Sequence, residues 1–108
     1  MIYKFRSKGA GDVIMLGPTG DRLLRAMGRE PAAKGIIEVD AMPDAIAALE
    51  RAIEDEETAF EQARKEAKAN GEPAPQREGG VSLRQRAWPL IEMLRRSHSA
   101  GHEIVWGV

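Results

Sequence analysis

The sequence predicts an α+β domain, in which a small antiparallel sheet of about three short strands packs on a long central helix, a kinked C-terminal helix and a short N-terminal helix. Three observations support this fold class. Two long segments carry apolar residues at helical spacing, short segments alternate between apolar and polar residues, and Gly or Pro separates them. The chain of 108 residues is long enough for one domain, residues 1–108, with its own core.

The first strand is expected at residues 2–7, where apolar and charged residues alternate. Tyr3 and Phe5 fall on one face of this strand, and Lys4 and Arg6 fall on the other. The aromatic face is therefore expected on the core and the charged face in water.

The next segment, residues 12–16, has two interpretations. Its four consecutive apolar residues can form a buried strand, or Asp12 can cap one helical turn. We favour the helical turn, because the apolar spacing continues as a helical stripe after an interruption at residues 17–18. A short helix is then expected over residues 18–27, ended by Gly28.

A second strand is expected at residues 35–39, where Ile37 and Val39 share a face. The long central helix follows at residues 44–70. Glu56 holds a position that would continue its apolar stripe, so this stripe is expected to be strong before residue 60 and weak beyond it. The stripe consists of Ile46, Leu49, Ile53, Phe60, Ala63 and Ala67.

Both ends of the central helix can be predicted. Asp40 or Asp44 can cap its first turn, and Gly71 supplies a left-handed residue after its last turn. At 1.5 Å per residue the helix is roughly 40 Å long, whereas a domain of this size is about 30 Å across. Residues 61–70 are therefore expected either to project into water or to lie on a partner chain.

Residues 71–80 are polar and rich in Gly and Pro, which predicts a mobile linker between the two main helices. Ser82 and Gln85 form the capping box of a last helix that begins near Leu83. Pro89 lies inside this helix and is expected to kink it. The apolar stripe consists of Leu83, Ala87, Leu90, Ile91, Leu94 and His98.

A third strand is expected at residues 102–106, with Ile104 and Trp106 on one face. The two main helices are expected to pack as an antiparallel helical hairpin. This arrangement brings Arg95 and Arg96 towards the acidic side of the central helix, formed by Glu50, Glu54 and Asp55.

The overall composition excludes several classes of protein. A net charge of −1 argues against a general nucleic-acid or membrane-surface binder. The chain has no cysteine, so it forms no disulfide and uses no thiolate chemistry. No apolar run reaches the ~20 residues that span a bilayer, and the N-terminus does not look like a signal peptide. We therefore expect a cytoplasmic protein.

The turn at residues 17–25, from Gly17 to Arg25, is the first candidate ligand site. The start of a helix can hold an anion, and Arg22 and Arg25 would add positive charge. The segment lacks the P-loop pattern, and Asp21 opposes an anion. The alternative is a tight turn with no ligand.

Arg86, Trp88 and Trp106 form the second candidate site. A helix kinked beside Pro89 could line a pocket with an indole ring and a guanidinium group. The alternative is that both tryptophans pack between elements, with their indole N–H groups satisfied locally.

The sequence contains no pattern typical of a catalytic or metal site. His98 and His102 have a zinc-compatible spacing, but Gly101 lies between them at the expected end of the helix. The carboxylates at residues 54–57 point in different directions on a helix. We therefore expect no catalytic residue, no metal and no cofactor, and we lean towards a protein that is not an enzyme.

Several strings across the chain resemble a family of short bacterial proteins known only as a domain of unknown function. The strings are Ser7-Lys8, Asp12-Val-Ile-Met-Leu-Gly-Pro18, Gly28-x-x-Pro31, Lys34-Gly-Ile-Ile37, Met42-Pro43, Leu83-Arg-Gln-Arg86-Ala-Trp-Pro-Leu90 and Val105-Trp-Gly-Val108. The resemblance implies a single-domain cytoplasmic protein of bacterial origin. It implies no activity, ligand or catalytic residue.

The function that these observations favour is a non-catalytic interaction or structural module that self-associates, with a dimer as the favoured oligomer. The over-long central helix and the lack of a catalytic pattern are the reasons. The alternative is a small-ligand or anion-binding protein that uses residues 17–25 or the region of Arg86, Trp88 and Trp106.

Overall fold

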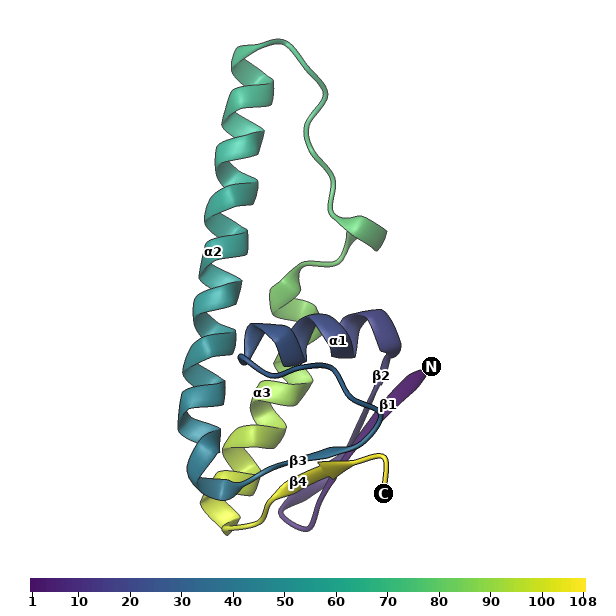
Figure 1. Ribbon diagram of the computed structural model, residues 1–108. Helices are drawn as coiled ribbons and strands as arrows, with labels where there is room; N and C mark the ends of the chain where they lie inside the picture. The colour runs from purple at the N-terminus through teal and green to yellow at the C-terminus, as the bar shows by residue number, and fades with distance from the viewer.

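The computed structural model describes residues 1–108 apart from the side chain of Glu78, and it confirms the α+β class (Figure 1). Four strands form one antiparallel sheet in the order β2-β1-β4-β3, one strand more than expected. The elements are β1 (Ile2–Ser7), β2 (Ala10–Leu16), α1 (Gly17–Ala26), β3 (Gly35–Ile37), η1 (Val39–Ala41), α2 (Met42–Ala69), η2 (Glu78–Gly80), α3 (Leu83–Ala100) and β4 (Ile104–Trp106).

Strand β1 lies in the interior of the sheet and alternates as predicted. Tyr3 and Phe5 are buried, and their rings stack with 5.7 Å between centroids. Phe5 also meets the edge of Trp106 at 5.4 Å, which joins β1 to the buried face of β4. These three rings form the sheet side of the core.

The helical interpretation of residues 12–16 is wrong, because these residues belong to strand β2. In the hairpin with β1, Val13 pairs with Phe5 and Met15 pairs with Tyr3, so both face the core. Their neighbours Ile14 and Leu16 are exposed on the outer face of the sheet. Since both faces carry apolar residues, the two-residue period of the strand is hidden in the sequence.

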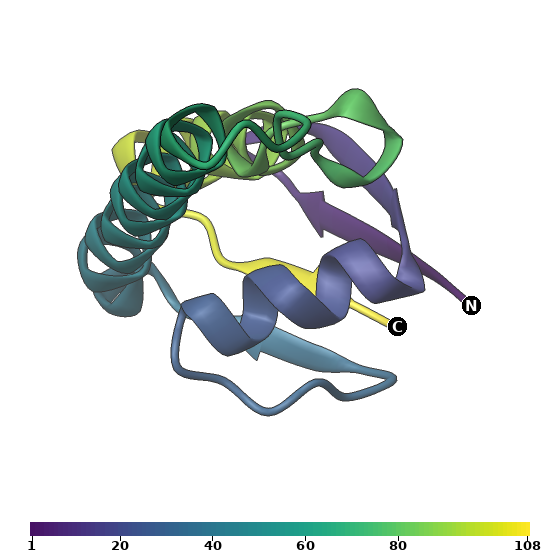
Figure 2. The same ribbon diagram turned by 90° about the horizontal axis from the view of Figure 1, so that it is seen from above.

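Helix α1 follows β2 directly and crosses the sheet (Figure 2). Its expected end is confirmed, because Gly28 has a φ of 82° and its N–H donates to the carbonyl of Arg25. Leu23 and Leu24 are buried in the core. Gly20 lies directly over the Tyr3 ring, so α1 sits close to the sheet.

Strands β3 and β4 are shorter than expected. β3 ends at Ile37, because its last partner in β4 is Ile104. Val39 therefore does not continue the strand and instead begins the 3₁₀ turn η1. Ile104 and Trp106 are buried on one face of β4 as predicted.

Helix α2 runs unbroken from Met42 to Ala69, which confirms the central prediction (Figure 1). Its buried residues are Met42, Ala45, Leu49 and Ile53. Ile46 and Phe60 are half-buried, whereas Ala63 is exposed, so the packed stripe ends earlier than expected. The predicted caps are wrong: neither Asp40 nor Asp44 caps the helix, because η1 leads into its first turn.

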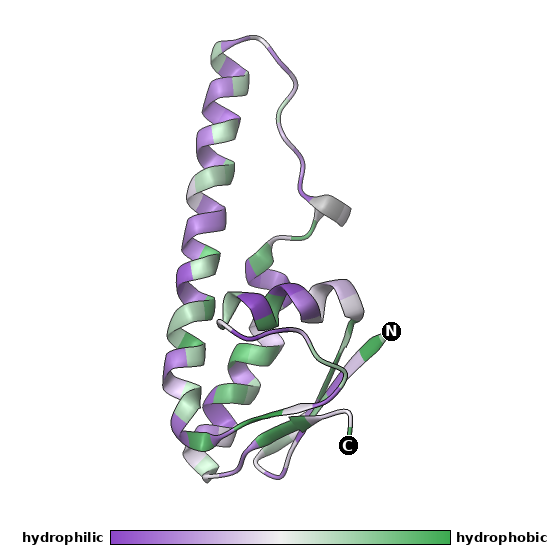
Figure 3. Cartoon of the chain, in the orientation of Figure 1, coloured by the Kyte–Doolittle hydropathy of each residue, from purple (hydrophilic) through white to green (hydrophobic). Residues whose placement is uncertain are grey.

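The second half of α2 extends well beyond the rest of the molecule, whose principal extents are 51 × 27 × 22 Å. Gly71 ends the helix with a φ of 68°, as expected. The overhanging segment, residues 61–69, is largely exposed, and Figure 3 colours it mostly as hydrophilic. Within it, the Arg64 guanidinium pairs with Glu61 at 2.7 Å.

Helix α3 begins with the predicted capping box, in which the Gln85 N–H donates to Ser82 Oγ at 3.1 Å. Pro89 lies inside α3, and the helix is continuous from Leu83 to Ala100. The expectation that His98 joins the apolar stripe is wrong, because His98 is exposed. Ser97 is buried instead, and its hydroxyl donates to Ser7 Oγ at 2.9 Å.

The two long helices lie side by side and antiparallel. Arg84 at the start of α3 pairs with Glu57 at 2.8 Å, and Arg95 further along α3 pairs with the earlier residue Glu50 at 3.1 Å. The predicted contact of Arg95 with the acidic side of α2 is therefore confirmed. The Arg84 hydrogen bond holds the pKa of the Glu57 carboxyl below its usual value.

Replacing Gly20 with Ala is expected to destabilise the fold, although Ala is the better helix former by about 1 kcal/mol. A Cβ atom at Gly20 would clash with the Tyr3 ring. Overpacking of this kind costs about 1–3 kcal/mol. Urea unfolding measures the change.

Gly11→Ala is the matched control, because a Cβ atom there meets no heavy atom within 4 Å. Equal unfolding free energies for the two variants would contradict the close packing of α1 on β1.

The side chain of Tyr3 makes stability depend on alkaline pH. Burial, and a hydrogen bond that the hydroxyl donates to Asp21, raise the Tyr3 pKa from 10 to about 12. The folded state therefore favours the neutral phenol. Its contribution to stability is complete below pH 10 and is lost as the pH rises through 12.

Tyr3 is the only tyrosine, so phenolate absorbance follows this group alone. We expect an apparent pKa near 12 in the folded protein. Phe has no ionisable hydroxyl. We therefore expect the Tyr3→Phe variant to lose less of its unfolding free energy than the wild type as the pH rises from 10 to 12. A phenolate that titrates near pH 10 in the folded state would contradict the burial of Tyr3.

Candidate functional site

A pocket of about 280 Å³ lies where α1, α2, the linker and the start of α3 meet. The linker returns from the far end of α2 towards the start of α3 (Figure 1). Its residues Gln76, Arg77 and Val81 line one side of this pocket. The pocket residues are Pro18, Thr19, Arg22, Glu56, Phe60, Gln76, Arg77, Val81, Leu83 and Arg86. Three separate stretches of the sequence, residues 18–22, 56–60 and 76–86, thus build a single concave site.

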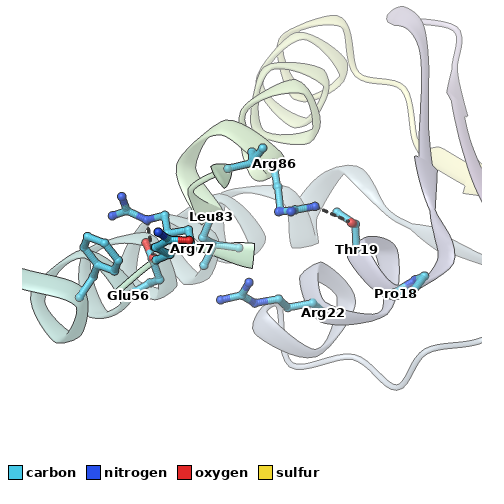
Figure 4. Close-up of a pocket in the computed structure, with 10 residues that line it drawn as sticks. Pro18, Thr19, Arg22, Glu56, Arg77, Leu83 and Arg86 are labelled. Atoms are coloured by element: carbon cyan, nitrogen blue, oxygen red, sulfur yellow. Dashed lines mark hydrogen bonds and ion pairs between the residues drawn. The ribbon is translucent and has the colours of Figure 1, made fainter. Parts of the chain in front are cut away.

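Three guanidinium groups line the pocket, each from a different segment. Arg22 comes from α1, Arg77 from the linker and Arg86 from α3. Arg86 donates to the Thr19 hydroxyl at 3.4 Å. Figure 4 shows Arg22 and Arg86 extending from opposite sides towards the space between α1 and α3.

The opposite wall is built around Glu56, the residue that interrupts the apolar stripe of α2. The Arg77 Nε atom donates to Glu56 Oε1 at 3.0 Å, and the Arg77 guanidinium lies 3.8 Å from the Phe60 ring centroid. This double contact anchors the linker to α2. Glu56 Oε2 is buried and has no hydrogen-bond partner among the described groups.

The pocket also has an apolar wall beside the three guanidinium groups. This wall is formed by Pro18, Phe60, Val81 and Leu83. The first turn of α1 also opens onto the pocket through Pro18 and Thr19, and a helix start favours negative charge. The arrangement can hold a small anion that has an apolar portion.

The structure brings together only two of the five residues that the sequence suggested as ligand-binding. Arg22 and Arg86 line the same pocket. Arg25 is exposed on α1 and lies outside it. Trp88 is 49% exposed on α3, where the Arg95 guanidinium lies 5.8 Å from its ring.

Trp106 is buried, and its indole N–H donates to the carbonyl of Ala32 at 3.0 Å. It therefore packs in the core and does not share a site with Trp88. The sequence patterns did not identify Arg77, Glu56 or Phe60 as site residues. The break that Glu56 makes in an apolar stripe was the signal that could have located them.

A second surface of interest is the outer face of the β1–β2 hairpin. Ile2, Ile14 and Leu16 form an apolar patch there, with exposed fractions of 63%, 63% and 67%. Ile2 pairs directly with Leu16 across the two strands. Figure 3 shows the adjoining ends of β1 and β2 as hydrophobic. Large exposed apolar residues gathered in one place are typical of interaction sites.

Metal sites and membrane-spanning helices are two further features that bear on function. Among the residues whose side chains are described, no group of three or more His, Asp or Glu is placed to hold a metal ion. Within the same part of the chain, none of the helices combines the length and apolar character needed to cross a bilayer.

Replacing Arg77 with Ala is expected to lower the free energy of unfolding by about 1–3 kcal/mol, because the mostly buried Glu56 carboxylate would lose its charged partner. It should also speed cleavage of residues 71–80 by a non-specific protease. Arg64→Ala is the control, since the exposed Arg64–Glu61 pair contributes about 0–1 kcal/mol. Equally small effects of both changes would show that Arg77 does not anchor the linker.

Comparisons with known proteins identify the family of this chain. No curated protein and no solved structure matches the chain. A family model described as Domain of unknown function (DUF1840) matches residues 1–106. This match covers nearly the whole chain and confirms the resemblance noted in the sequence. The chain belongs to the DUF1840 family, a domain of unknown function.

Proposed function

We propose that this protein is a non-catalytic interaction module that self-associates as a dimer through the outer face of the β1–β2 hairpin. The observation that carries the proposal is the apolar patch of Ile2, Ile14 and Leu16. The helices pack on the other face of the sheet, against Tyr3 and the other buried residues. The patch is thus left uncovered in the single chain.

A second copy of the chain is the partner that best fits this patch. In a two-fold symmetric interface the same surface meets itself, so the surface must be self-complementary. Aliphatic side chains satisfy this condition, whereas a patch of one charge would repel its copy. The net charge of −1 adds little repulsion between two copies.

The size of the patch suits a reversible dimer. Burying a large apolar side chain contributes about 1.5–3 kcal/mol, and association costs about 4–15 kcal/mol. Three such side chains from each copy contribute at most about 9–18 kcal/mol. This gain is comparable with the cost, so we expect the dimer to be weak and reversible. Lys4 and Asp12, which pair at 3.7 Å beside the patch, provide a polar rim.

The overhang of α2 is a weaker candidate for the dimer interface. Several of its polar groups are paired within the helix: Arg64 with Glu61 at 2.7 Å, and Gln62 with Glu66 at 3.2 Å. Among the described side chains of residues 61–69, none is an exposed large hydrophobic group. The overhang therefore resembles a solvated helix end.

The remaining parts of the proposal follow from the sequence. The protein acts in the bacterial cytoplasm and needs no metal or cofactor. It binds neither nucleic acid nor membranes, in keeping with its near-neutral charge. Its activity then consists of binding and not of catalysis.

Replacing Ile14 with Lys is expected to convert the dimer into a monomer, because it places a charged ammonium group inside the apolar patch, where burial in the interface would cost its hydration. Light scattering coupled to size exclusion, at concentrations from about 1 µM to 1 mM, measures the mass. Ile14 is already exposed, so the monomer should keep its stability.

Ala63→Lys on the overhang is the matched control and should leave the dimer intact. A wild-type protein that stays monomeric throughout this range would refute self-association. A dimer broken by Ala63→Lys and not by Ile14→Lys would place the interface on α2.

A further inference from the structure

We infer that the pocket between α1, α2, the linker and α3 is a binding site for a small organic anion, one that carries a phosphate or carboxylate group beside an apolar body. Arg22 and Arg86, which the sequence suggested as ligand-binding residues, line this pocket together with Arg77. The inference does not depend on self-association, because the pocket is formed by the helices and the linker of one chain.

The strongest argument is the convergence of three guanidinium groups from separate segments. Long arginine side chains at a surface are free to extend into water and away from one another. Here Arg22, Arg77 and Arg86 line one cavity, with a single carboxylate, Glu56, among the described lining groups. Because Arg77 is already paired with Glu56, the charge that faces the cavity and favours a bound anion comes chiefly from Arg22.

Each arginine has a distinct position in the site. Arg77 is fixed by Glu56 and by the Phe60 ring, so it forms a rigid wall. Arg86 is directed by its hydrogen bond to Thr19 at 3.4 Å. Arg22 makes no hydrogen bond or ion pair with the described residues, and it extends into the space between α1 and α3 (Figure 4). Arg22 is therefore the residue that meets the ligand most directly.

The size and walls of the cavity limit the ligand. A volume of 280 Å³ is about nine times the ~30 Å³ that one water molecule occupies in the liquid. This space suits a molecule of about ten non-hydrogen atoms. Phe60, Val81 and Leu83 provide contacts for an apolar body, while the arginines and the first turn of α1 receive the anionic group.

Binding of phenyl phosphate and of benzoate to the full chain, measured by isothermal titration calorimetry, tests the inference. We expect saturable binding of at least one of the two, and the tighter one identifies the preferred anionic group. Inorganic phosphate should bind more weakly, because it leaves the apolar wall empty. Benzyl alcohol, which is uncharged, should not bind.

Arg22→Gln is expected to weaken this binding at least tenfold, because it removes the charge that faces the ligand. Arg25→Gln is the matched control: it makes the same change on the same helix, at an exposed residue outside the pocket. It should leave the affinity within about twofold of the wild type. Equal losses in both variants would mean non-specific attraction and would overturn the inference.

Two further outcomes would also overturn it. One is the lack of saturable binding of either anion at concentrations up to about 10 mM, where even weak ligands bind. The other comes from amide NMR shifts of the wild-type protein, which do not require a stable variant. Shifts induced by the ligand should gather at residues 18–22, 76–77 and 81–86. Shifts located elsewhere would show that the pocket is not the site.

Discussion

The packed stripe of α2 ends at Ile53, whereas the helix continues to Ala69, and this mismatch determines most of the structure. α3 packs on the apolar part of α2 that ends at Ile53, and Arg95 and Arg84 flank this contact by pairing with Glu50 and Glu57. The chain must therefore travel back along the second half before α3 begins. The returning linker is held where Arg77 meets Glu56 and Phe60, and this contact creates the pocket.

Sequence patterns predicted the elements whose two faces differ in polarity. The alternation of Tyr3 and Phe5 with charged residues identified β1, and the Ser82–Gln85 capping box located the start of α3. β2 was misassigned because Ile14 and Leu16 make its outer face apolar as well. The apolar outer face of β2 therefore has two consequences: it obscures the alternating pattern of the strand in the sequence, and it forms the candidate interface.

The pocket was only partly predictable, because it depends on the path of the linker. Arg22 and Arg86 were recognisable as cationic residues near helix starts, yet no spacing rule relates them to each other. Trp106 was grouped with Trp88 by residue type, but one is buried against Phe5 and the other is half exposed on α3. Arg77 lies in a segment without periodicity, so its contact with Glu56 becomes evident only in three dimensions.

Amide hydrogen exchange along α2, combined with backbone chemical shifts, tests most directly whether one continuous helix extends beyond its own core. The structure predicts helical shifts as far as Ala69, slowest exchange near Leu49 and Ile53, and much faster exchange over residues 61–69. Loss of helical shifts between Ile53 and Ala69 would contradict this account. Exchange at residues 61–69 as slow as at Leu49 would contradict it too, because that half of the helix would then be packed.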